Sequence, residues 1–264
     1  MPDGSFDSYV GLGVVSAAAY PGAADRQVKL RPLLQFETSG GLFVSGMSAG
    51  LHLSQQPGLE FGPLLALDPG RDASGINGGA GGVTDPVAGF GVRPSLPISP
   101  VTRVAGPGFG LSGLHDVRRR LQGGVFANYY LSADVRLTGT LLYGAGNDHD
   151  GLVGTIGIQR MAVEFAPHHK VTVSAGVTLV NASHNASYFG VSKDEAGVTG
   201  YSAYAPRSGV RDVYVGAGWN WALSPSWMVT SAARLSVLTG DARHSPLTER
   251  PTNFTVTTGL AYRF

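Results

Sequence analysis

The sequence predicts an all-β protein, a single transmembrane antiparallel up-and-down β-barrel of about 12 strands that spans residues 1–264. Three observations favour this fold class. Apolar residues alternate with small or polar ones at the period of two that an extended chain imposes. No apolar run approaches the ~18 residues that a membrane-spanning helix needs. Glycine contributes 39 residues, which suits strands that curve and pack closely.

The last stretch of the chain, residues 251–264, carries the clearest strand pattern. One face of this predicted strand is small or polar, and the other consists of Phe254, Val256, Thr258, Leu260, Tyr262 and Phe264. A terminal Phe with Tyr two residues before it and Leu four residues before it resembles the assembly signal of bacterial outer-membrane barrels. The resemblance assigns this signal to Leu260, Tyr262 and Phe264, and it implies two partners, outer-membrane lipid and the barrel assembly machinery.

The composition narrows the classes of partner and cofactor. With no cysteine, the chain has no disulfide and no Cys-ligated metal centre. A net charge of +1 gives no reason to expect nucleic acid or another polyanion as partner. Residues 1–5 hold neither a basic nor an apolar signal region, so we expect a mature-length chain. We also expect a monomer without cofactors.

Eleven strands can be placed from the alternation, at residues 7–17, 27–38, 42–54, 59–67, 121–131, 133–144, 151–167, 171–179, 213–221, 227–237 and 251–264. In one of them, Ile156 and Ile158 share a parity with the charged Arg160 and Glu164. Because these residues cannot all face lipid, we expect either a β-bulge near Gln159 or a register that the alternation does not fix.

The alternation fails over residues 68–114, which we predict to be an irregular insert. Bacterial single-chain barrels have an even number of strands, with both termini and the short turns on the periplasmic side. Counted from the two ends of the chain, the strands at residues 59–67 and 121–131 both run toward the periplasm. We therefore predict a twelfth strand between Asp68 and Arg120, with the start of the insert on the periplasmic side.

Charged residues fall on the predicted inner faces of several strands, and these lumen charges are Lys29, Arg31, Glu37, Glu60, Asp134, Arg136, Arg234 and Arg263. Two interpretations compete. The charges form a paired network that plugs the lumen, because charges in a confined space need partners, or they line a narrow water-filled pore. We favour the plug, since only barrels of ~16 strands reliably leave a wide channel.

A long loop at about residues 181–208 is predicted on the outer side of the membrane. It holds more aromatic surface than a solvated loop needs, in Tyr188, Phe189, Tyr201 and Tyr204. We expect these rings to pack against or into the barrel mouth and to help close the lumen.

Two motifs suggest chemistry but lack its structural context. Residues 46–50 match the G-x-S-x-G pattern of hydrolases, yet no helix follows, so we expect an uninterrupted strand over residues 42–54 with Phe43 on its lipid face. His and Asp residues at 148–150 and 168–169 lie in predicted turns, whereas a metal site needs three or four convergent ligands. We expect no catalytic, cofactor-binding or metal-binding residue and no enzymatic activity.

Several landmarks together resemble the MipA/OmpV family of outer-membrane proteins. In chain order they are Tyr20-Pro21-Gly22, Gly62-Pro63-Leu64, Pro69-Gly70-Arg71-Asp72, Gly113-Leu114-His115-Asp116-Val117, Tyr188-Phe189-Gly190-Val191, Gly240-Asp241-Ala242 and Tyr262-Arg263-Phe264. The resemblance covers nearly the whole chain, and the Gly- and Pro-rich stretch at residues 75–108 is longer than the family pattern. It implies a barrel in the bacterial outer membrane.

For the member that gives the family its name, the resemblance further implies a scaffold role toward a lytic transglycosylase and a peptidoglycan synthase. Our first functional hypothesis is therefore a structural scaffold of the envelope with periplasmic peptidoglycan enzymes as partners. The alternative is a narrow pore for ions or small solutes. For the scaffold, we expect Arg71, Asp72 and residues 75–82 to provide the periplasmic contact, together with residues 168–170.

Overall fold

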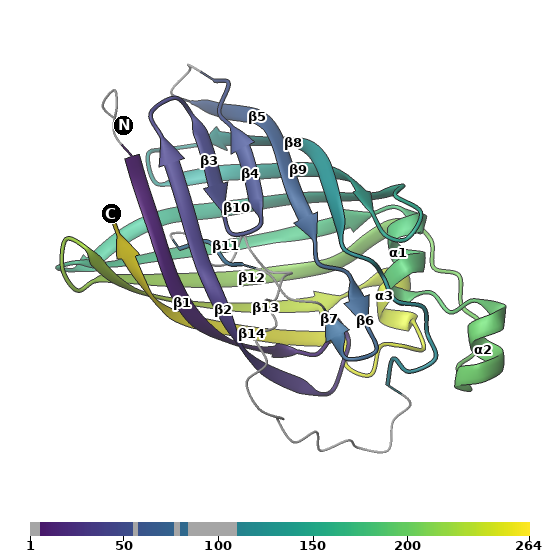
Figure 1. The fold of residues 1–264 in the computed structure, drawn as a ribbon. Helices are drawn as coiled ribbons and strands as arrows, with labels where there is room; N and C mark the ends of the chain where they lie inside the picture. Colours follow the sequence, from purple (N-terminus) through teal and green to yellow (C-terminus); the bar gives the residue numbers. More distant parts are fainter. Residues whose placement is uncertain (1–5, 55–57, 77–79, 84–109) are drawn as a thin grey trace.

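The computed structural model describes residues 6–54, 58–76, 80–83 and 110–264, and it shows a closed β-barrel (Figure 1). The strands follow one another around the barrel in the order β1-β14-β13-β12-β11-β10-β9-β8-β5-β4-β3-β2, and each pairs with its neighbours in antiparallel fashion. The predicted fold class, an antiparallel barrel of about 12 strands, is confirmed.

The barrel strands are β1 (Phe6–Ala18), β2 (Arg26–Thr38), β3 (Leu42–Ser45), β4 (Ser48–Leu51), β5 (Leu59–Asp68), β8 (Arg120–Tyr130), β9 (Val135–Ala145), β10 (Gly151–Ala166), β11 (His169–Val180), β12 (Gly209–Ala222), β13 (Trp227–Leu238) and β14 (Thr252–Arg263). A small separate hairpin consists of β6 (Arg71–Asp72) and β7 (Gly75–Ile76).

The predicted alternation is visible in the exposure of neighbouring side chains. Leu121 is 66% exposed, whereas the next residue, Gln122, is 6% exposed. On β14, Phe254 is 45% exposed and Thr257 only 2%. Exposed apolar side chains on one face of every long strand are what a barrel surrounded by lipid requires, and the opposite face is the lumen.

The C-terminal strand closes the barrel against the first one. Leu12 of β1 lies opposite Leu260 of β14, and Val10 lies opposite Tyr262. Phe264 donates its backbone N–H to the Ser8 carbonyl at 3.1 Å, and these three side chains of the predicted assembly signal are exposed on the outer surface. The end of the chain therefore completes the hydrogen-bond ladder that leaves the barrel without an edge.

Residues 42–54 do not form the single predicted strand. Gly46 adopts a φ of 57°, and the chain reverses at Gly46 and Met47 so that Ser45 of β3 pairs with Ser48 of β4. A left-handed backbone at this position favours glycine, which has no Cβ to clash with the preceding carbonyl. The G-x-S-x-G motif is therefore the turn of a short hairpin, and this split supplies the twelfth strand.

The position predicted for that strand, between Asp68 and Arg120, is wrong. β5 pairs directly with β8, from Leu59 opposite Tyr129 to Asp68 opposite Arg120, so no barrel strand lies between them. The predicted orientation of Phe43 toward lipid is also wrong. Its ring packs at 5.4 Å against Phe126 on the inner face of β8, because the tight hairpin fixes the register of β3 more strongly than the apolar pattern suggests.

The early reversal at Gly46 also corrects the direction of β5. This strand runs away from the end of the barrel that holds both termini, which we call the terminal end, and not toward it. Consequently the connection from β5 to β8 leaves from the opposite end, the cap end, with β6 and β7 (Figure 1). Arg71, Asp72, Gly75 and Ile76, predicted on the periplasmic side, therefore lie at the cap end, opposite the two termini.

Three short helices also lie at the cap end, α1 (Ala182–Phe189), α2 (Lys193–Thr199) and α3 (Gly240–His244) (Figure 1). Among the described residues, no helix has the length and apolarity to cross a membrane. Asn181 caps α1 by accepting the backbone N–H of His184 at 3.0 Å, and Ser192 and Glu195 form a capping box on α2. These caps thus stabilise two helices in a connection whose sequence lacks the alternation of a strand.

The register of β10 shifts between Arg160 and Val163 in its pairing with β11. Val163 then shares the outward parity of Ile156 and Ile158 even though it lies an odd number of residues beyond them. A bulge is therefore present, but it comes after Arg160, which keeps the outward parity opposite the exposed Val173, and only Glu164 returns to the inner face, opposite Lys170.

Close packing inside the lumen depends on glycines around Leu33, which is fully buried. A Cβ placed on Gly259 would lie 2.5 Å from the Leu33 Cδ1 atom and 2.8 Å from the Gly13 Cα atom. Because backbone cannot move aside as a flexible side chain can, this contact leaves no room for a methyl group. Glycine at 259 lets the β1–β14 seam and Leu33 approach each other.

We predict that Gly259→Ala lowers the free energy of unfolding by about 1–3 kcal/mol, the usual cost of overpacking. Thermal unfolding in detergent, followed by the heat-dependent shift in gel mobility, measures the effect. Gly139→Ala is the matched control, because its Cβ would meet nothing closer than the Ala127 carbonyl at 3.6 Å. Equal unfolding midpoints for the two variants would contradict the packing argument.

Candidate functional site

The inner faces of the strands bring the predicted lumen charges together, with one exception. Lys29, Arg31 and Glu37 share the inner parity of the buried Leu33 on β2, and Glu60, Arg136, Arg234 and Arg263 lie on the inner faces of their strands. Asp134 does not reach the lumen. It is exposed in the turn before β9, where its N–H bonds to Ser132 Oγ at 3.3 Å, because the tight turn ends the strand pairing there.

One polar cluster spans four consecutive barrel strands and is centred on Glu60. This carboxylate accepts hydrogen bonds from the Tyr130 hydroxyl at 2.7 Å and from Asn128 Nδ2 at 3.2 Å. Arg136 Nη1 lies 3.6 Å from the same carboxylate, and Arg136 Nε donates to Gln159 Oε1 at 2.8 Å. Charges of both signs on β5 and β9 are thus paired across β8.

A second polar cluster is centred on Asp212, which is 4% exposed. It accepts hydrogen bonds from Thr178 Oγ1 at 3.2 Å and from Arg211 Nε at 2.8 Å. Arg234 Nη2 lies 3.7 Å away, and the Arg234 guanidinium carbon lies 3.6 Å from the centre of the Tyr214 ring. Sequence reasoning missed Asp212 because its predicted strand began at Val213, although Asp212 and Tyr214 share a parity.

A segment of the chain itself enters the barrel at residues 80–83, which we call the lumen segment. Gly81 donates its N–H to the Pro32 carbonyl at 2.9 Å, and Leu34 donates to the Gly81 carbonyl at 2.8 Å. These bonds lie along the edge of β2 beyond the point where β3 ends. The lumen segment therefore continues the wall pairing that the short β3–β4 hairpin interrupts.

Beyond Gly81, the lumen segment lies inside the barrel. Val83 is fully buried against Tyr9, Leu33 and Ala261. Its N–H bonds to Gln35 Oε1 at 3.0 Å, and its carbonyl accepts from Thr230 Oγ1 at 3.0 Å. Bonds to both β2 and β13, which flank the β1–β14 pair, hold this backbone against the inner wall over the β1–β14 seam.

Arg31 takes part in the same arrangement. Its side chain is 2% exposed, and its Nη2 donates to the Ala80 carbonyl at 3.1 Å. A buried guanidinium needs acceptors because removing it from water is costly. One of the predicted lumen charges thus binds the lumen segment directly.

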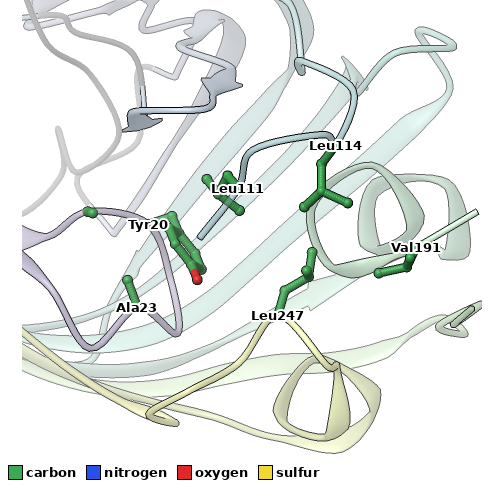
Figure 2. Packing of buried hydrophobic residues seen from close by; sticks show 7 residues of the cluster. Tyr20, Ala23, Leu111, Leu114, Val191 and Leu247 are labelled. Atoms are coloured by element: carbon green, nitrogen blue, oxygen red, sulfur yellow. The ribbon is translucent and has the colours of Figure 1, made fainter. Parts of the chain in front are cut away.

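The cap end is covered by connections that pack on one another. Figure 2 shows Tyr20, Ala23, Leu111, Leu114, Val191 and Leu247 converging from four separate parts of the chain. Each of these side chains is at most 9% exposed. We call this layer of connections the cap; it has an apolar core of its own, outside the barrel.

The four aromatic residues of the loop at residues 181–208 all lie in the cap. Tyr188 and Phe189 are buried with Val117 and Leu238 in a second apolar cluster. Tyr201 and Tyr204 are half-buried against the first cluster, and their hydroxyls donate to the carbonyls of Gly110 and Asp241. The rings anchor this loop to other connections of the cap end.

Asp68 joins the cap to the rim of the barrel. At the end of β5 it is 7% exposed, and it accepts hydrogen bonds from the Tyr188 hydroxyl, the Gly70 N–H and Gln122 Nε2. Arg71, 3% exposed, donates to the Tyr188 carbonyl at 2.8 Å. No pattern in the sequence connects Asp68 with a tyrosine so far along the chain.

Burial controls the protonation of the groups that hold the cap. It raises the pKa of the Tyr188 hydroxyl well above its usual value, and the Asp68 carboxylate adds to the rise. Burial together with the Arg211 charge lowers the pKa of His184 well below the usual range. Tyr188 therefore remains a hydrogen-bond donor, and His184 remains neutral, at physiological pH.

Within the described part of the chain, no three His, Asp or Glu side chains converge as metal ligands would. Asp150, one of the turn residues considered as a metal ligand, instead accepts a hydrogen bond from Ser183 Oγ at 2.8 Å. The paired charges and the lumen segment thus lie inside the barrel, and the cap lies over its cap end.

Comparison with known proteins identifies the family. The family described as MltA-interacting protein MipA matches residues 10–264, nearly the whole chain. The chain belongs to the MipA family. Membership confirms the resemblance found in the sequence, and this MipA-family chain is a barrel protein of the bacterial outer membrane. No curated protein matches the chain.

Several solved structures are similar to this MipA-family barrel over most of its length. A bacterial polysaccharide outer membrane secretin has a TM-score of 0.50 at 9% identity, with 97% of this chain and 98% of that chain covered. The translocator domain of the autotransporter NalP from Neisseria meningitidis scores 0.48 at 10% identity, covering 100% and 90%. An outer membrane channel from Pseudomonas putida F1 scores 0.46 at 9% identity, covering 100% and 97%. At such identities the likeness concerns the fold alone.

Glu195 gives the cap a measurable dependence on pH. Its carboxylate accepts the backbone N–H groups of Ser192 at 2.7 Å and His115 at 2.8 Å. Partial burial raises the pKa of Glu195, but these hydrogen bonds outweigh burial and hold the pKa at about 2. A folded-state pKa below the unfolded value means that ionised Glu195 stabilises the cap.

We therefore predict that hydrogen exchange at residues 192–200 is slow above about pH 4.5 and accelerates, relative to the intrinsic rate, as the pH falls toward about 2. Mass spectrometry on the folded barrel in detergent measures this exchange. Glu195→Gln, which cannot ionise, should show faster exchange with no pH dependence in that window. Constant protection of the original chain from about pH 6 to about pH 2 would count against the role of Glu195.

Proposed function

We propose that this MipA-family chain is a closed outer-membrane barrel that works as a structural scaffold of the envelope, toward peptidoglycan-remodelling enzymes in the periplasm. The observation that carries the proposal is the position of Val83, which is fully buried inside the barrel and hydrogen-bonded to Gln35 and Thr230. A pore needs a continuous water-filled path. A backbone segment held inside the lumen narrows such a path.

The paired charges give further support to a closed barrel. Glu60 with Arg136, and Asp212 with Arg234, neutralise each other within the lumen, whereas a selective pore exposes rings of one sign to passing ions. The cap adds a second closure above the lumen segment, because Tyr188 is tied to the barrel rim through Asp68.

The family description names an interaction with MltA, which by the resemblance stated above is a lytic transglycosylase. For this chain, an enzyme in the periplasm would meet the terminal end, where both termini and the short turns lie. Standard interfaces bury ~800 Å² per partner, so the contact spreads over several turns. Exposed Leu131 and Leu223, beside two different turns, offer apolar area there.

We predict that the purified barrel gives no stable single-channel step in planar bilayers. Replacing both hydrogen-bond partners of Val83, in Gln35→Ala with Thr230→Val, should release the lumen segment and raise the conductance. Gly139→Ala, on an outward face, serves as the control and should stay silent. A stable ion-selective step in the original chain that changes in Arg31→Ala or Arg234→Ala would instead establish the pore.

We predict that the barrel in detergent binds a soluble form of MltA from the same bacterium, measured by biolayer interferometry. Leu131→Asp with Leu223→Asp should raise the Kd at least about tenfold, because each removes apolar contact area worth about 1–2 kcal/mol. Val198→Asp is the matched control, since Val198 is 76% exposed on α2 at the opposite end. Absence of binding by the original chain would overturn the scaffold proposal.

A further inference from the structure

A cavity of about 440 Å³ lies at the rim of the cap end, and Ala18, Arg26 and Phe254 of its lining have the outward parity of β1, β2 and β14. It is formed where β14, β1 and β2 lie side by side (Figure 1). Its lining residues are Ala18, Ala23, Ala24, Arg26, Arg250, Pro251, Thr252, Asn253 and Phe254. Two arginines in so small a cavity distinguish it from the apolar surface below it.

Arg26 is held in place by the wall. It has the outward parity of Val28 on β2, and its side chain crosses β1 to reach β14. Nη1 donates to the Phe254 carbonyl at 2.8 Å, and Nη2 lies 3.2 Å from the Ser16 carbonyl and 3.0 Å from Ser16 Oγ. A guanidinium has five N–H donors, so N–H groups remain for a ligand.

The position of Arg26 along the wall is that of a lipid headgroup. Its guanidinium carbon lies 5.9 Å from the centre of the lipid-facing Phe254 ring. Below it, the outward residues Val14 and Val28 are 46% and 53% exposed and carry no charge. The side chain thus lies over apolar surface and holds its charge at the boundary between acyl chains and headgroups.

The two arginines of the cavity are not held by ion pairs. In the described ranges, no carboxylate forms an ion pair with Arg26 or Arg250. The nearby Glu249 carboxylate is oriented by hydrogen bonds from two neutral donors, the Tyr20 hydroxyl and the Ala24 N–H, and forms no ion pair with either arginine. Arg250 is exposed, and only its backbone is tied down, by a 2.9 Å bond to the Gly22 carbonyl.

We propose that this cavity binds the phosphate group of a lipid in the outer leaflet, with its acyl chains along the apolar surface below. Arginine binds phosphate through paired N–H···O bonds, and the exposed Thr252 at the rim adds a hydroxyl donor. The continuity of the cavity with the lipid-facing wall argues for a membrane lipid and against a soluble phosphate. The site does not depend on the scaffold proposal, because it lies at the opposite end of the barrel.

The test uses the whole chain in phosphatidylcholine nanodiscs that contain lipid A with its phosphates, or lipid A from which the phosphates have been removed. Native mass spectrometry counts the glycolipid retained at increasing lipid A content. We expect retention of the phosphorylated form alone. Arg26→Gln with Arg250→Gln should weaken it about thirtyfold, since each cation near a membrane surface contributes about fivefold.

Arg243→Gln is the matched control, because Arg243 is an exposed arginine of α3 at the same end and outside the cavity; it should bind as the original chain does. Heat-dependent gel mobility verifies that each variant is folded. Equal retention of dephosphorylated lipid A, or full retention by the double variant, would overturn the proposal. Equal competition by inorganic phosphate would overturn it too, since the site would then take a soluble anion.

Discussion

The constraint on which the structure depends is the closure of the hydrogen-bond ladder between β1 and β14. Lipid offers no partner for an unpaired backbone N–H or carbonyl group, so every strand edge inside the membrane needs a neighbour. The seam from Tyr9 opposite Arg263 to Ser16 opposite Val256 supplies the last of these pairs. Glycines along the seam, such as Gly259 facing Leu33, let the first and last strands approach closely enough to pair.

The same constraint explains the lumen segment. Because β3 and β4 form a short hairpin, β3 pairs only with residues 35–37 of β2, and the part of that edge nearer the cap end has no residue of β3 beside it. Gly81 supplies backbone partners for part of that edge, and the chain then continues into the lumen to Val83. Closing the wall and filling the interior are thus done by one segment, and the buried Arg31 joins both through its bond to Ala80.

Polar groups in the lumen and the cap follow a second requirement, that buried charges find partners. The register of each strand fixes the position of its charged side chains along the inner face. Which of these charges form ion pairs then depends on which strands are neighbours. Glu60 and Arg136 meet across β8 because β5 pairs with β8 directly. If the predicted twelfth strand lay between these two, Glu60 and Arg136 would be too far apart to pair. The interior network is therefore a consequence of strand order.

The sequence by itself determined the fold class and the face of most strands, because a period of two is a local property that lipid on one side enforces. The resemblance of its landmarks to the MipA/OmpV family indicated the outer-membrane location. The bulge in β10 was one of two alternatives that the same period indicated. Tertiary structure decided the hairpin at Gly46, the direction of β5 and the parity of Phe43, since one left-handed glycine reverses a chain without changing the apolar pattern around it. It also decided the pairing of Asp68 with Tyr188 and the burial of Val83, because contacts between distant parts of a chain depend on closure of the whole barrel, which no local pattern encodes.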